Sequence, residues 1–435
     1  MLILGMGLTG ISCLHFFVSR KIYPKIMNFD SNSKYIKNIK LFKNITYHIG
    51  SINYEWIRES DLIIKSPGIT LSHPALIYAH KKGIEIIGDI ELFVRETNVP
   101  IIAITGSNGK STVTTMVNNI LQLSGLKVYM GGNIGIPALN ILNHSAELYI
   151  LELSSFQLET TSTLKPEIAS VLNISPDHMN RYPLGMTEYR QKKLKIYNKA
   201  KLSILNLEDE LSYNKDIKTR PNITFGVKKG EYHLKKIYNC IWLCYKSTKL
   251  LNTNKLLISG QHNYINALSA LSIVHNLNID IKISLKALQQ FLGLPHRFQF
   301  VYKRNNVVWI NDSKSTNIGS TQSAINNLLP YVIGKIRLIL GGDGKLADFS
   351  LLKPYLKHEN IIIYCYGKSQ RTLSTLFPEK SMCLNTLKDT VYFIKKILKP
   401  HDIVLLSPAC SSVDQFSNFE ERGNVFMKLI KDIHQ

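Results

Sequence analysis

Long apolar runs are absent from this sequence, so we expect no membrane span. No stretch approaches the ~18 consecutive apolar residues that a transmembrane helix requires. Cysteine is also scarce, with 6 residues in 435, and Cys240 and Cys244 lack the second Cys or His pair that would complete a zinc site. The N-terminus has no basic region of the kind that opens a signal peptide. We therefore expect a cytoplasmic protein with reduced thiols.

Acidic residues are the next shortage, because 31 Asp and Glu stand against 53 Lys and Arg, for a net charge of +22. The basic residues are dispersed and form no block of about five or six like charges, which a nucleic-acid-binding tail would have. Small anionic substrates would suit such a charge. We expect no nucleic-acid partner, no membrane partner and a monomer.

A glycine pattern follows the first apolar segment, "MLILG". Gly5, Gly7 and Gly10 form G-x-G-x-x-G before a helix-like segment, and a second strand-like segment ends at Asp30. Strand, glycine loop, helix, strand and acid are typical of dinucleotide-binding domains, with the acid ~20 residues after the loop. The pattern alone leaves two interpretations open: an ordinary turn between strand and helix, or a site for NAD or another diphosphate.

A second glycine loop, "TGSNGKST", lies between the strand-like "PIIAIT" and a segment with apolar residues at helical spacing. It departs from the usual G-x-x-x-x-G-K-[ST] pattern, because only Ser-Asn separates Gly106 from the Gly-Lys-Ser run. The context is still that of a phosphate-binding loop, since backbone N–H groups and a helix start attract phosphate oxygens. Lys110 can reach the outer phosphates and Ser111 can contact Mg²⁺. We therefore predict ATP binding.

Strand-like and helix-like segments alternate through three stretches of the chain, which fits a length of ~150 residues per domain. This pattern predicts a Rossmann-like domain at residues 1–88, a central domain with a P-loop ATPase-like parallel sheet at residues 89–293, and a second Rossmann-like domain at residues 294–435. In the last stretch, "VVWIND", "RLILGG" and "DIVLLSPAC" are strands followed by polar loops, which indicates a functional face at their carboxyl ends. The expected fold class is α/β with three domains.

Several side chains after predicted strands could take part in chemistry, and each has an ordinary structural alternative. Glu152 follows "ELYIL", where a carboxylate can hold Mg²⁺ or be solvated. His178 lies in a loop after "IASVLN", where a lone histidine is most often structural. Asn263 and Asn266 begin a helix, where they could read an adenine edge or cap the helix. The run "YRQKKLKIY" does not say which of its lysines, if any, reaches a site.

Taken together and in order, these segments resemble the Mur ligases of peptidoglycan synthesis, from the first residues nearly to the last. The resemblance is carried by "GMGLTG", "SPGI", "TGSNGKST", "GGNIGIPAL", "LELSSFQLE", "ISPDHMNRY", "YRQKKLKIY", "GQHNYINALSA", "LPHRFQ", "NDSKSTN", "LGGDGK" and "SPACSSVDQFSNFEERG". The phosphate loop alone would also fit folylpolyglutamate synthases. "GMGLTG", "NDSKSTN" and "SPACSSVDQF" are similar to the D-glutamate-adding branch of the Mur ligases.

The resemblance implies a role for each matching residue, and it implies a UDP-linked substrate instead of NAD at the first glycine loop. The positions that match ATP contacts are Gly106, Ser107, Asn108, Gly109, Lys110, Ser111, Thr112, Asn263, Asn266, Arg297 and Asp312. Those that match substrate contacts are Leu8, Thr9, Ser31, Ser66, Pro67, Gly68, Asn133, Ser154, Gln157, Lys314, Thr316, Lys345, Ser412 and Phe419. The metal positions are Ser111, Glu152, His178 and Lys193, the last as the N-carboxylated (carbamylated) lysine of the family. The implied catalytic residues are Lys110, His178 and Lys193.

The activity that the resemblance implies is ATP-dependent formation of an amide bond. D-Glutamate would be added to UDP-N-acetylmuramoyl-L-alanine through an acyl phosphate, with Mg²⁺ as cofactor. One position departs from the family, which typically carries Asp-Thr-Arg after the second strand. This chain has Asp30-Ser31-Asn32, so an arginine contact near the uracil is missing.

Two rival interpretations come from the same residues. A non-catalytic nucleotide-binding module is disfavoured by the presence together of Lys110, Glu152, His178 and Lys193. An NAD oxidoreductase would explain the first glycine loop and leave the second one unexplained.

Overall fold

The computed structural model describes residues 1–30, 42 and 44–434, so the predicted contacts at Ser31 and Asn32 lie outside the described residues. The chain forms two compact units, and each is described on its own. The first comprises Met1–Ile174, Thr187–Lys255 and Ile265–Gln289. The second comprises Ser175–Met186, Leu256–Tyr264 and Gln290–Gln435. Within the described residues, no helix is long and apolar enough to cross a membrane.

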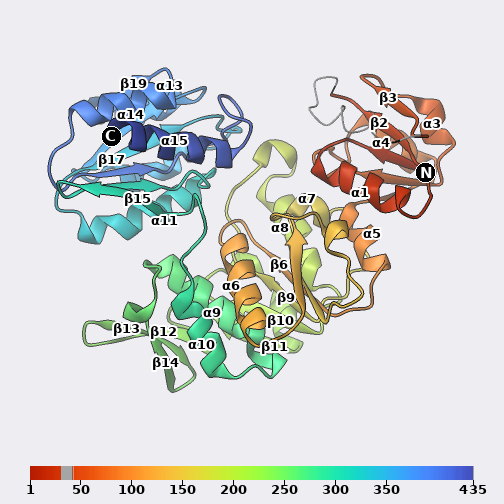
Figure 1. The fold of residues 1–435 in the computed structure, drawn as a ribbon, viewed down its shortest axis with the longest axis horizontal. Helices are drawn as coiled ribbons and strands as arrows, with labels where there is room; N and C mark the ends of the chain where they lie inside the picture. The colour runs from red at the N-terminus through yellow and green to blue at the C-terminus, as the bar shows by residue number, and fades with distance from the viewer. Residues whose placement is uncertain (31–41, 43, 435) are drawn as a thin grey trace. The chain divides into compact units, whose positions relative to one another are not determined.

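The first sheet is parallel and is built from the N-terminal part of the first unit (Figure 1). In the described residues its strand order is β3-β2-β1-β4-β5, so the first strand is central and β5 is an edge. The strands are β1 (Leu2–Leu4), β2 (Lys25–Asn28), β3 (Tyr47–Ile49), β4 (Leu62–Lys65) and β5 (Glu85–Ile87). The helices are α1 (Leu8–Val18), α3 (Tyr54–Arg58), α4 (Pro74–Lys81) and α5 (Asp89–Arg95).

The second sheet has the order β14-β13-β12-β11-β10-β9-β6-β8-β7 in the part of the chain that is described. The strands are β6 (Ile101–Thr105), β7 (Val128–Gly132), β8 (Leu148–Glu152), β9 (Ile168–Val171), β10 (Leu202–Asn206), β11 (Asn222–Phe225), β12 (Tyr232–Ile237), β13 (Cys240–Tyr245) and β14 (Thr248–Asn252). The α-helices are α6 (Lys110–Leu123), α7 (Ser155–Leu158), α8 (Met186–Leu194), α9 (Gln261–Val274) and α10 (Ile281–Gln290). The 3₁₀ turns are η1 (Ala138–Ile141), η2 (Met179–Arg181), η3 (Lys195–Tyr197), η4 (Glu210–Ser212), η5 (Lys215–Thr219), η6 (Thr253–Lys255) and η7 (His275–Leu277).

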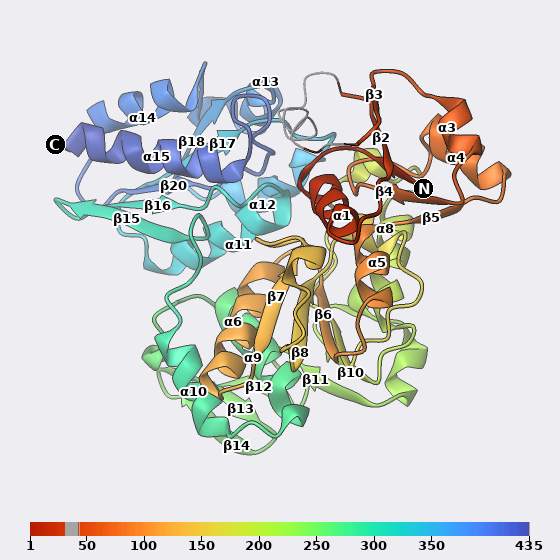
Figure 2. The same cartoon turned by 45° about the vertical axis from the view of Figure 1, so that its right-hand side comes forward.

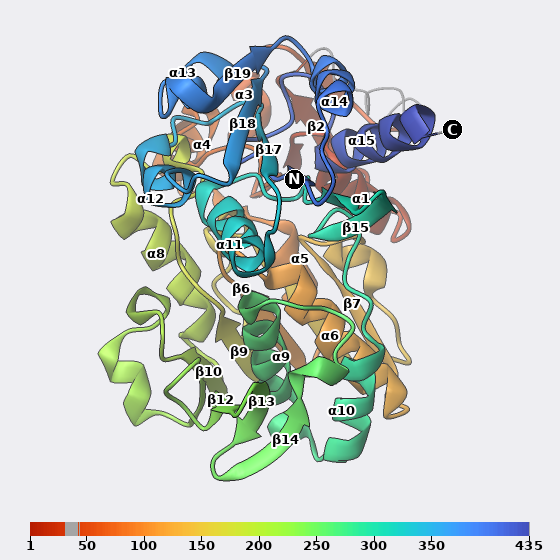
Figure 3. The same cartoon turned by 90° about the vertical axis from the view of Figure 1, so that its left-hand side faces the viewer.

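One end of this sheet differs from the purely parallel arrangement that the sequence predicts. The strands from β6 to β11 are parallel, but β12, β13 and β14 pair antiparallel. Short turns at Tyr238 and Lys246, both with positive φ, allow these strands to fold back directly. Tyr232 on β12 shares a 2.7 Å hydrogen bond with His275 after α9, and the antiparallel strands lie beside α9 and α10 (Figure 3).

The third sheet lies in the second unit and has the order β15-β16-β20-β17-β18-β19 among the described strands. Among the strands described for this sheet, only β15 is antiparallel to its neighbour, and the other pairs are parallel. The strands are β15 (Gln299–Arg304), β16 (Val307–Asn311), β17 (Ile336–Gly341), β18 (Ile361–Tyr366), β19 (Ser381–Leu384) and β20 (Ile403–Leu406). The helices are α11 (Ile318–Leu328), η8 (Leu329–Tyr331), η9 (Phe349–Leu352), α12 (Lys353–Leu356), α13 (Gln370–Ser374), η10 (Pro378–Lys380), α14 (Leu387–Lys396) and α15 (Phe419–His434).

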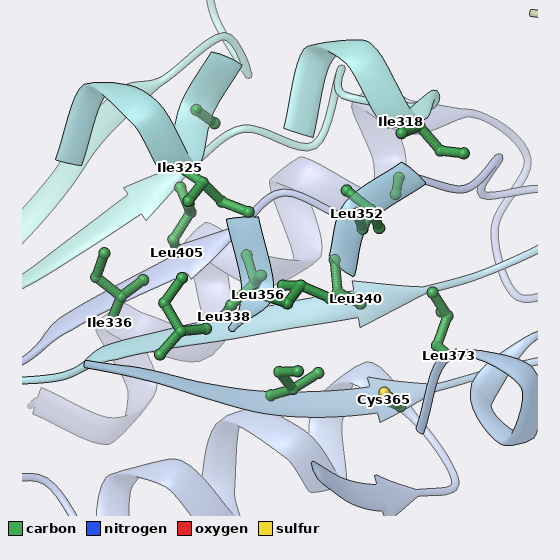
Figure 4. Close-up of a cluster of buried hydrophobic side chains, with 14 of the residues drawn as sticks. Ile318, Ile325, Ile336, Leu338, Leu340, Leu352, Leu356, Cys365, Leu373 and Leu405 are labelled. Carbon is green, nitrogen blue, oxygen red and sulfur yellow. The ribbon is translucent and has the colours of Figure 1, made fainter. Parts of the chain in front are cut away.

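Helices cover both faces of this third sheet, as expected for a parallel sheet buried on two sides. On one face, Ile325 of α11 and Leu356 of α12 pack on Leu338 and Leu340 of β17 (Figure 4). On the other face, α14 and α15 pack on alternate residues of the same strands, including Ile339 (Figure 2). The near-continuous burial of "IRLILG" is thus explained by its two apolar faces. Three separate sheets, two of them within the first compact unit, confirm the predicted three-domain α/β fold class.

Candidate functional site

The loop between β6 and α6 is held in place by one asparagine. The backbone N–H groups of Ser107 and Asn108 donate to the carbonyl and side-chain oxygens of Asn173, at 2.9 and 2.8 Å. The Asn173 amide donates back to the Asn108 carbonyl at 3.0 Å. Gly109 ends the loop at φ +82°, where a Cβ would lie 2.6 Å from Asn266 Oδ1. Asn173 was not predicted as a site residue. Its position just after the buried strand β9 is the feature of the sequence that could have indicated it.

Two lysines converge on one carbonyl of this loop. Lys110 Nζ donates to the Gly106 carbonyl at 2.8 Å and to the Ser107 carbonyl at 3.0 Å. Lys193 Nζ donates to the same Gly106 oxygen at 2.9 Å, and its residue is only 2% exposed. The Tyr189 ring lies below the Lys193 ammonium at 4.9 Å. Two cationic groups against one carbonyl make this loop attractive to an anion such as a phosphate. The structure thereby distinguishes Lys193 from the other lysines of its run.

Glu152 ends β8, directly beside the phosphate-loop strand, because it pairs in register with Ile104 of β6. Its Oε1 accepts from the Asn133 amide at 2.7 Å. Its Oε2 is buried and has no hydrogen-bond partner within the described part of the chain. A buried carboxylate oxygen that lacks a donor is costly unless a cation compensates it, so the residue fits Mg²⁺ coordination. Ser111, in the first turn of α6, and Lys193 are the other predicted metal positions in this unit.

The predicted substrate residues Ser154 and Gln157 form a capping box at the start of α7. Ser154 Oγ accepts from the Gln157 backbone N–H at 3.2 Å, and the Gln157 side chain accepts from the Ser154 backbone at 3.1 Å. Gln157 Nε2 also donates to Asp89 Oδ2 at 3.2 Å. Complete burial raises the pKa of Asp89 to about 6, although the Gln157 hydrogen bond opposes this rise. Gln157 thus connects the helix start to a buried carboxyl group.

We expect the stability of Asp89→Asn to increase relative to that of the wild type as the pH rises. Because the pKa of Asp89 is higher in the folded protein, the folded state keeps the proton to a higher pH than the unfolded chain does. The stability that the protonated Asp89 contributes is therefore lost between about pH 4 and pH 6. The free energy of unfolding of Asp89→Asn, relative to wild type, should increase by about 2 kcal/mol from pH 4 to pH 7. Urea unfolding at the two pH values measures this difference.

The exposed Asp61 supplies the matched control, because Asp61→Asn should show no such divergence. An equal pH response of Asp89→Asn and wild type would contradict a costly buried carboxylate at position 89.

The first glycine loop joins β1 to α1 and is tied to two neighbouring strands. The Met6 N–H donates to Asn28 Oδ1 at 3.0 Å, and Ser66 Oγ donates to the Gly5 carbonyl at 2.8 Å. A Cβ on Gly10 would clash with the Gly5 carbonyl, which explains the third glycine of the pattern. The predicted substrate residues here are Leu8 and Thr9 at the start of α1, and Ser66, Pro67 and Gly68 after β4. They occupy the carboxyl ends of adjacent parallel strands, the usual ligand edge of such a sheet.

In the second unit, Asp312 follows β16 and organises its loop. One carboxylate oxygen accepts from the Phe298 N–H at 3.0 Å, and the other accepts from the Ser315 and Ser407 hydroxyls. Burial raises the pKa of Asp312 to about 6, against the opposing effect of these hydrogen bonds and of Arg297. The predicted ATP residue Asp312 therefore has a clear structural role. Asn263, near the start of α9, donates to the Ser259 carbonyl at 2.8 Å.

The loops after β16 and β20 are joined by a buried arginine that was not predicted. Arg422 is 0% exposed and donates to the Ser313 hydroxyl and carbonyl at 2.9 and 2.7 Å. It also donates to the Cys410 carbonyl at 3.1 Å. Next to this arginine, Lys314 Nζ lies 3.7 Å from the centre of the Phe419 ring. The predicted substrate residues Thr316 and Ser412 belong to the same loops.

The segment with His178 belongs to this second unit and packs on the same loops. His178 has φ +56° and lies 3.7 Å from Asp177, measured from Nε2 to Oδ1. Asn317 Nδ2 donates to Asp177 Oδ2 at 3.2 Å, and Lys345 Nζ is 4.0 Å from Asp177 Oδ1. Within this unit, the structure therefore brings together His178, Lys345 and the loop of Asn317.

The predicted catalytic residues are divided between the two units. Lys110 and Lys193 meet at the phosphate loop of the first unit, near Glu152, and His178 lies in the second. Among the described residues, no group of three or more His, Cys, Asp or Glu side chains forms a ready metal site. The candidate metal positions are therefore a serine, a carboxylate, a histidine and a lysine that would need chemical conversion to an anion.

Three family models match successive parts of the chain. Residues 1–88 match the family model described as "Mur ligase MurD-like, N-terminal domain". Residues 104–274 match "Mur ligase middle domain", and residues 296–410 match "Mur ligase, glutamate ligase domain".

Curated relatives extend over nearly the full length. The UDP-N-acetylmuramoylalanine--D-glutamate ligase of Buchnera aphidicola subsp. Baizongia pistaciae is 60% identical, with 99% of this chain and 97% of the relative covered. The ligase of the same name from Escherichia coli K12 is 48% identical, with 99% and 98% covered.

Solved structures share the fold. The UDP-N-acetylmuramate-alanine ligase MurC of Thermotoga maritima matches with a TM-score of 0.65 at 19% identity, covering 99% of each chain. The MurF ligase of the same organism, solved in complex with ADP, matches with a TM-score of 0.61 at 17% identity, covering 88% of this chain and 98% of that one. The glycine loops, the buried site residues and these full-length matches together place the chain in the Mur ligase family.

Proposed function

We propose that this chain is an ATP-dependent ligase that joins D-glutamate to UDP-N-acetylmuramoyl-L-alanine in peptidoglycan precursor synthesis. The observation that carries the proposal is the convergence of Lys110 and Lys193 on the Gly106 carbonyl, beside the buried carboxylate of Glu152. The name shared by the full-length relatives supports the choice of substrates. We also propose that it acts as a monomer in the cytoplasm, with domains at 1–88, 89–293 and 294–435.

In the first step, the L-alanyl carboxylate attacks the γ-phosphorus of ATP. A new carboxyl O–P bond forms, the bond to the β-phosphate oxygen breaks, and ADP leaves with an acyl phosphate as the other product. Lys110 would leave its two loop carbonyls and contact the transferred phosphoryl group, where positive charge lowers the barrier. Asn173 fixes the backbone of the loop through its bonds to Ser107 and Asn108, and a fixed loop would keep the phosphates oriented.

Ser111 and Glu152 would hold Mg²⁺ at the phosphate loop, where a carbamylated Lys193 would help to orient it, and His178 is the proposed ligand of a second Mg²⁺. When bound, Mg²⁺ would neutralise phosphate charge at this loop. The buried Oε2 of Glu152, which has no donor in the described structure, supports this assignment. Lys193 as an ammonium would repel a cation, so it fits the set only as the carbamate anion.

In the second step, the amine of D-glutamate attacks the carbonyl carbon of the acyl phosphate. A C–N bond forms, the C–O bond to phosphate breaks, and one amine proton is transferred either to His178 or to a phosphate oxygen. Lys314, Thr316, Lys345, Ser412 and Phe419 are proposed to receive the amino acid. Arg422 supports this role by holding the loops that carry Lys314 and Ser412.

We expect phosphate release from ATP only when both UDP-N-acetylmuramoyl-L-alanine and D-glutamate are present. The activated carboxyl group needs the sugar nucleotide, and release of phosphate needs the amine. A coupled phosphate assay with each substrate omitted in turn measures this dependence. Release that ignores D-glutamate, or that is equally fast with L-glutamate, would contradict the proposed substrates.

A further inference from the structure

The first unit contains a cavity of about 650 Å³ that the ligase reaction does not use. One wall consists of α4 and the edge strand β5 of the first sheet, which pack beside each other (Figure 2). The other wall is the segment that follows α7, residues 159–162, together with Lys195 of η3. None of the residues assigned above to ATP, Mg²⁺ or substrate lines this cavity. Its volume is within the range of small-molecule sites.

The wall of the cavity is mainly aliphatic. It includes Leu71, Leu76, Ile77, Ile84 and Ile86. Ile77 on α4 is 43% exposed, so a large apolar side chain in the lining faces water. A ligand with an apolar chain would remove this surface from water, and each buried methylene would strengthen its binding.

The two carboxylates of the lining already have cationic partners. Glu85 Oε1 lies 2.6 Å from the Arg95 guanidinium. Glu159 Oε2 lies 3.8 Å from the buried ammonium of Lys65. These pairs cancel the negative charge at the cavity wall.

In the part of the chain that is described, the ammonium groups of the lining have no carboxylate in direct contact. Lys81 and Lys195 form no ion pair within 4.0 Å in the described structure. Lys195 Nζ donates to the Glu159 carbonyl at 3.0 Å, and an ammonium has three donors. Burial lowers the pKa of Lys195 and the nearby Lys192 lowers it further, against the opposing effect of the more distant Glu159 and Glu91 carboxylates, so an anion in direct contact would stabilise the ammonium.

We propose that this cavity binds an organic monocarboxylate with an apolar chain, its carboxylate at Lys195 and Lys81 and its chain against the isoleucines of α4 and β5. The aliphatic walls select the chain, and the ammonium groups of Lys81 and Lys195, which have no directly paired carboxylate in the described structure, select a negatively charged head over a positive or neutral one. Because the two walls come from separate segments of the first unit, the ligand would also hold them together.

Octanoate is the probe for this site. We expect it to shift the δ1-methyl NMR signals of Ile77, Ile84, Ile86 and Ile87 saturably in the full-length protein labelled at isoleucine methyls. Acetate, which lacks the chain, and octylammonium, which inverts the charge, should leave the four signals unmoved at the same concentrations.

Two variants test the two halves of the site. Ile77→Glu places a carboxylate on the apolar wall and should weaken octanoate binding about tenfold or more. Lys81→Met removes one exposed cation and should weaken it about twofold to fivefold. Ile22→Glu is the matched control, because Ile22 is similarly exposed at 45% and does not line the cavity, so binding should be unchanged. No saturable shift with octanoate, equal shifts with octylammonium, or equal weakening by Ile22→Glu would overturn the proposal.

Discussion

The Lys110→Ala variant should release phosphate at least about a thousandfold more slowly than the wild type, because it lacks the positive charge that would contact the transferred phosphoryl group. In the structure, the Lys110 ammonium lies on the Gly106 and Ser107 carbonyls at 2.8 and 3.0 Å, within the loop that would hold the phosphates. These two bonds keep the ammonium at the loop before ATP arrives. The bonds to neutral carbonyls can be exchanged for bonds to a phosphate oxygen, which are stronger because they are charge-assisted.

The measurement is the initial rate of phosphate release with both substrates at saturating concentration. The loss should fall mainly on kcat, since the lysine would stabilise the negative charge that shifts onto the leaving and transferred oxygens in the transition state more than it stabilises bound ATP. Lys127→Ala is the matched control, since Lys127 is an exposed lysine of the same unit and should keep wild-type activity. A Lys110→Ala enzyme within tenfold of wild type would remove Lys110 from the catalytic residues.

The Lys193→Ala variant should release phosphate about a hundredfold or more slowly than the wild type. Short carboxylates should restore part of this activity, because the functional group is expected to be a carbamate anion. The amine of Lys193 would add to CO₂ and lose a proton, giving N–COO⁻. The environment supports such a conversion. The side chain is 2% exposed, its nitrogen is 2.9 Å from the Gly106 carbonyl, and a second cation, Lys110, bonds to the same oxygen. An anion at this position would offset the charge of Lys110.

Formate, acetate and propionate are the rescue agents, tested on the rate of phosphate release. We expect each to raise the activity of Lys193→Ala severalfold and to leave that of Lys110→Ala unchanged. Lys192→Ala is the matched control, because Lys192 is partly exposed and lies 4.0 Å from Glu188. Near-wild-type activity of Lys193→Ala, or an absence of any response to the carboxylates, would show that Lys193 acts only as a buried lysine.

The local parts of the site could be predicted from the sequence. A buried strand, a glycine loop and a helix start at Lys110 follow one another directly, and Lys110 bonds to carbonyls only four and three positions before it. Local geometry decides such contacts, since a helix start and its preceding loop have few conformations. The same holds for the capping box of Ser154 and Gln157, which is a contact over three positions. That role was missed because the motif was interpreted only as a substrate contact.

The antiparallel strands β12 to β14 show a different limit. Their segments are short and bounded by the turns at Tyr238 and Lys246, yet they follow a run of parallel strands in the chain. Sequence patterns predict strands better than they predict pairing direction, because direction depends on the length and course of each connection. Asn173 and Arg422 were missed for a similar reason, since their partners lie on loops of other strands.

The sequence by itself determined the fold class, the two glycine loops and the family, because ordered motifs and apolar periodicity are local properties of the chain. Residue spacing left open which lysine of "YRQKKLKIY" reaches the phosphate loop, and the family resemblance implied Lys193. The tertiary structure places Lys193 Nζ on the carbonyl of Gly106, 87 positions away in the chain. It also placed Asn133 on Glu152 and left one oxygen of that carboxylate without a donor in the described structure. Strand order brings such residues together, and strand order is set by packing of the whole sheet and not by any one segment.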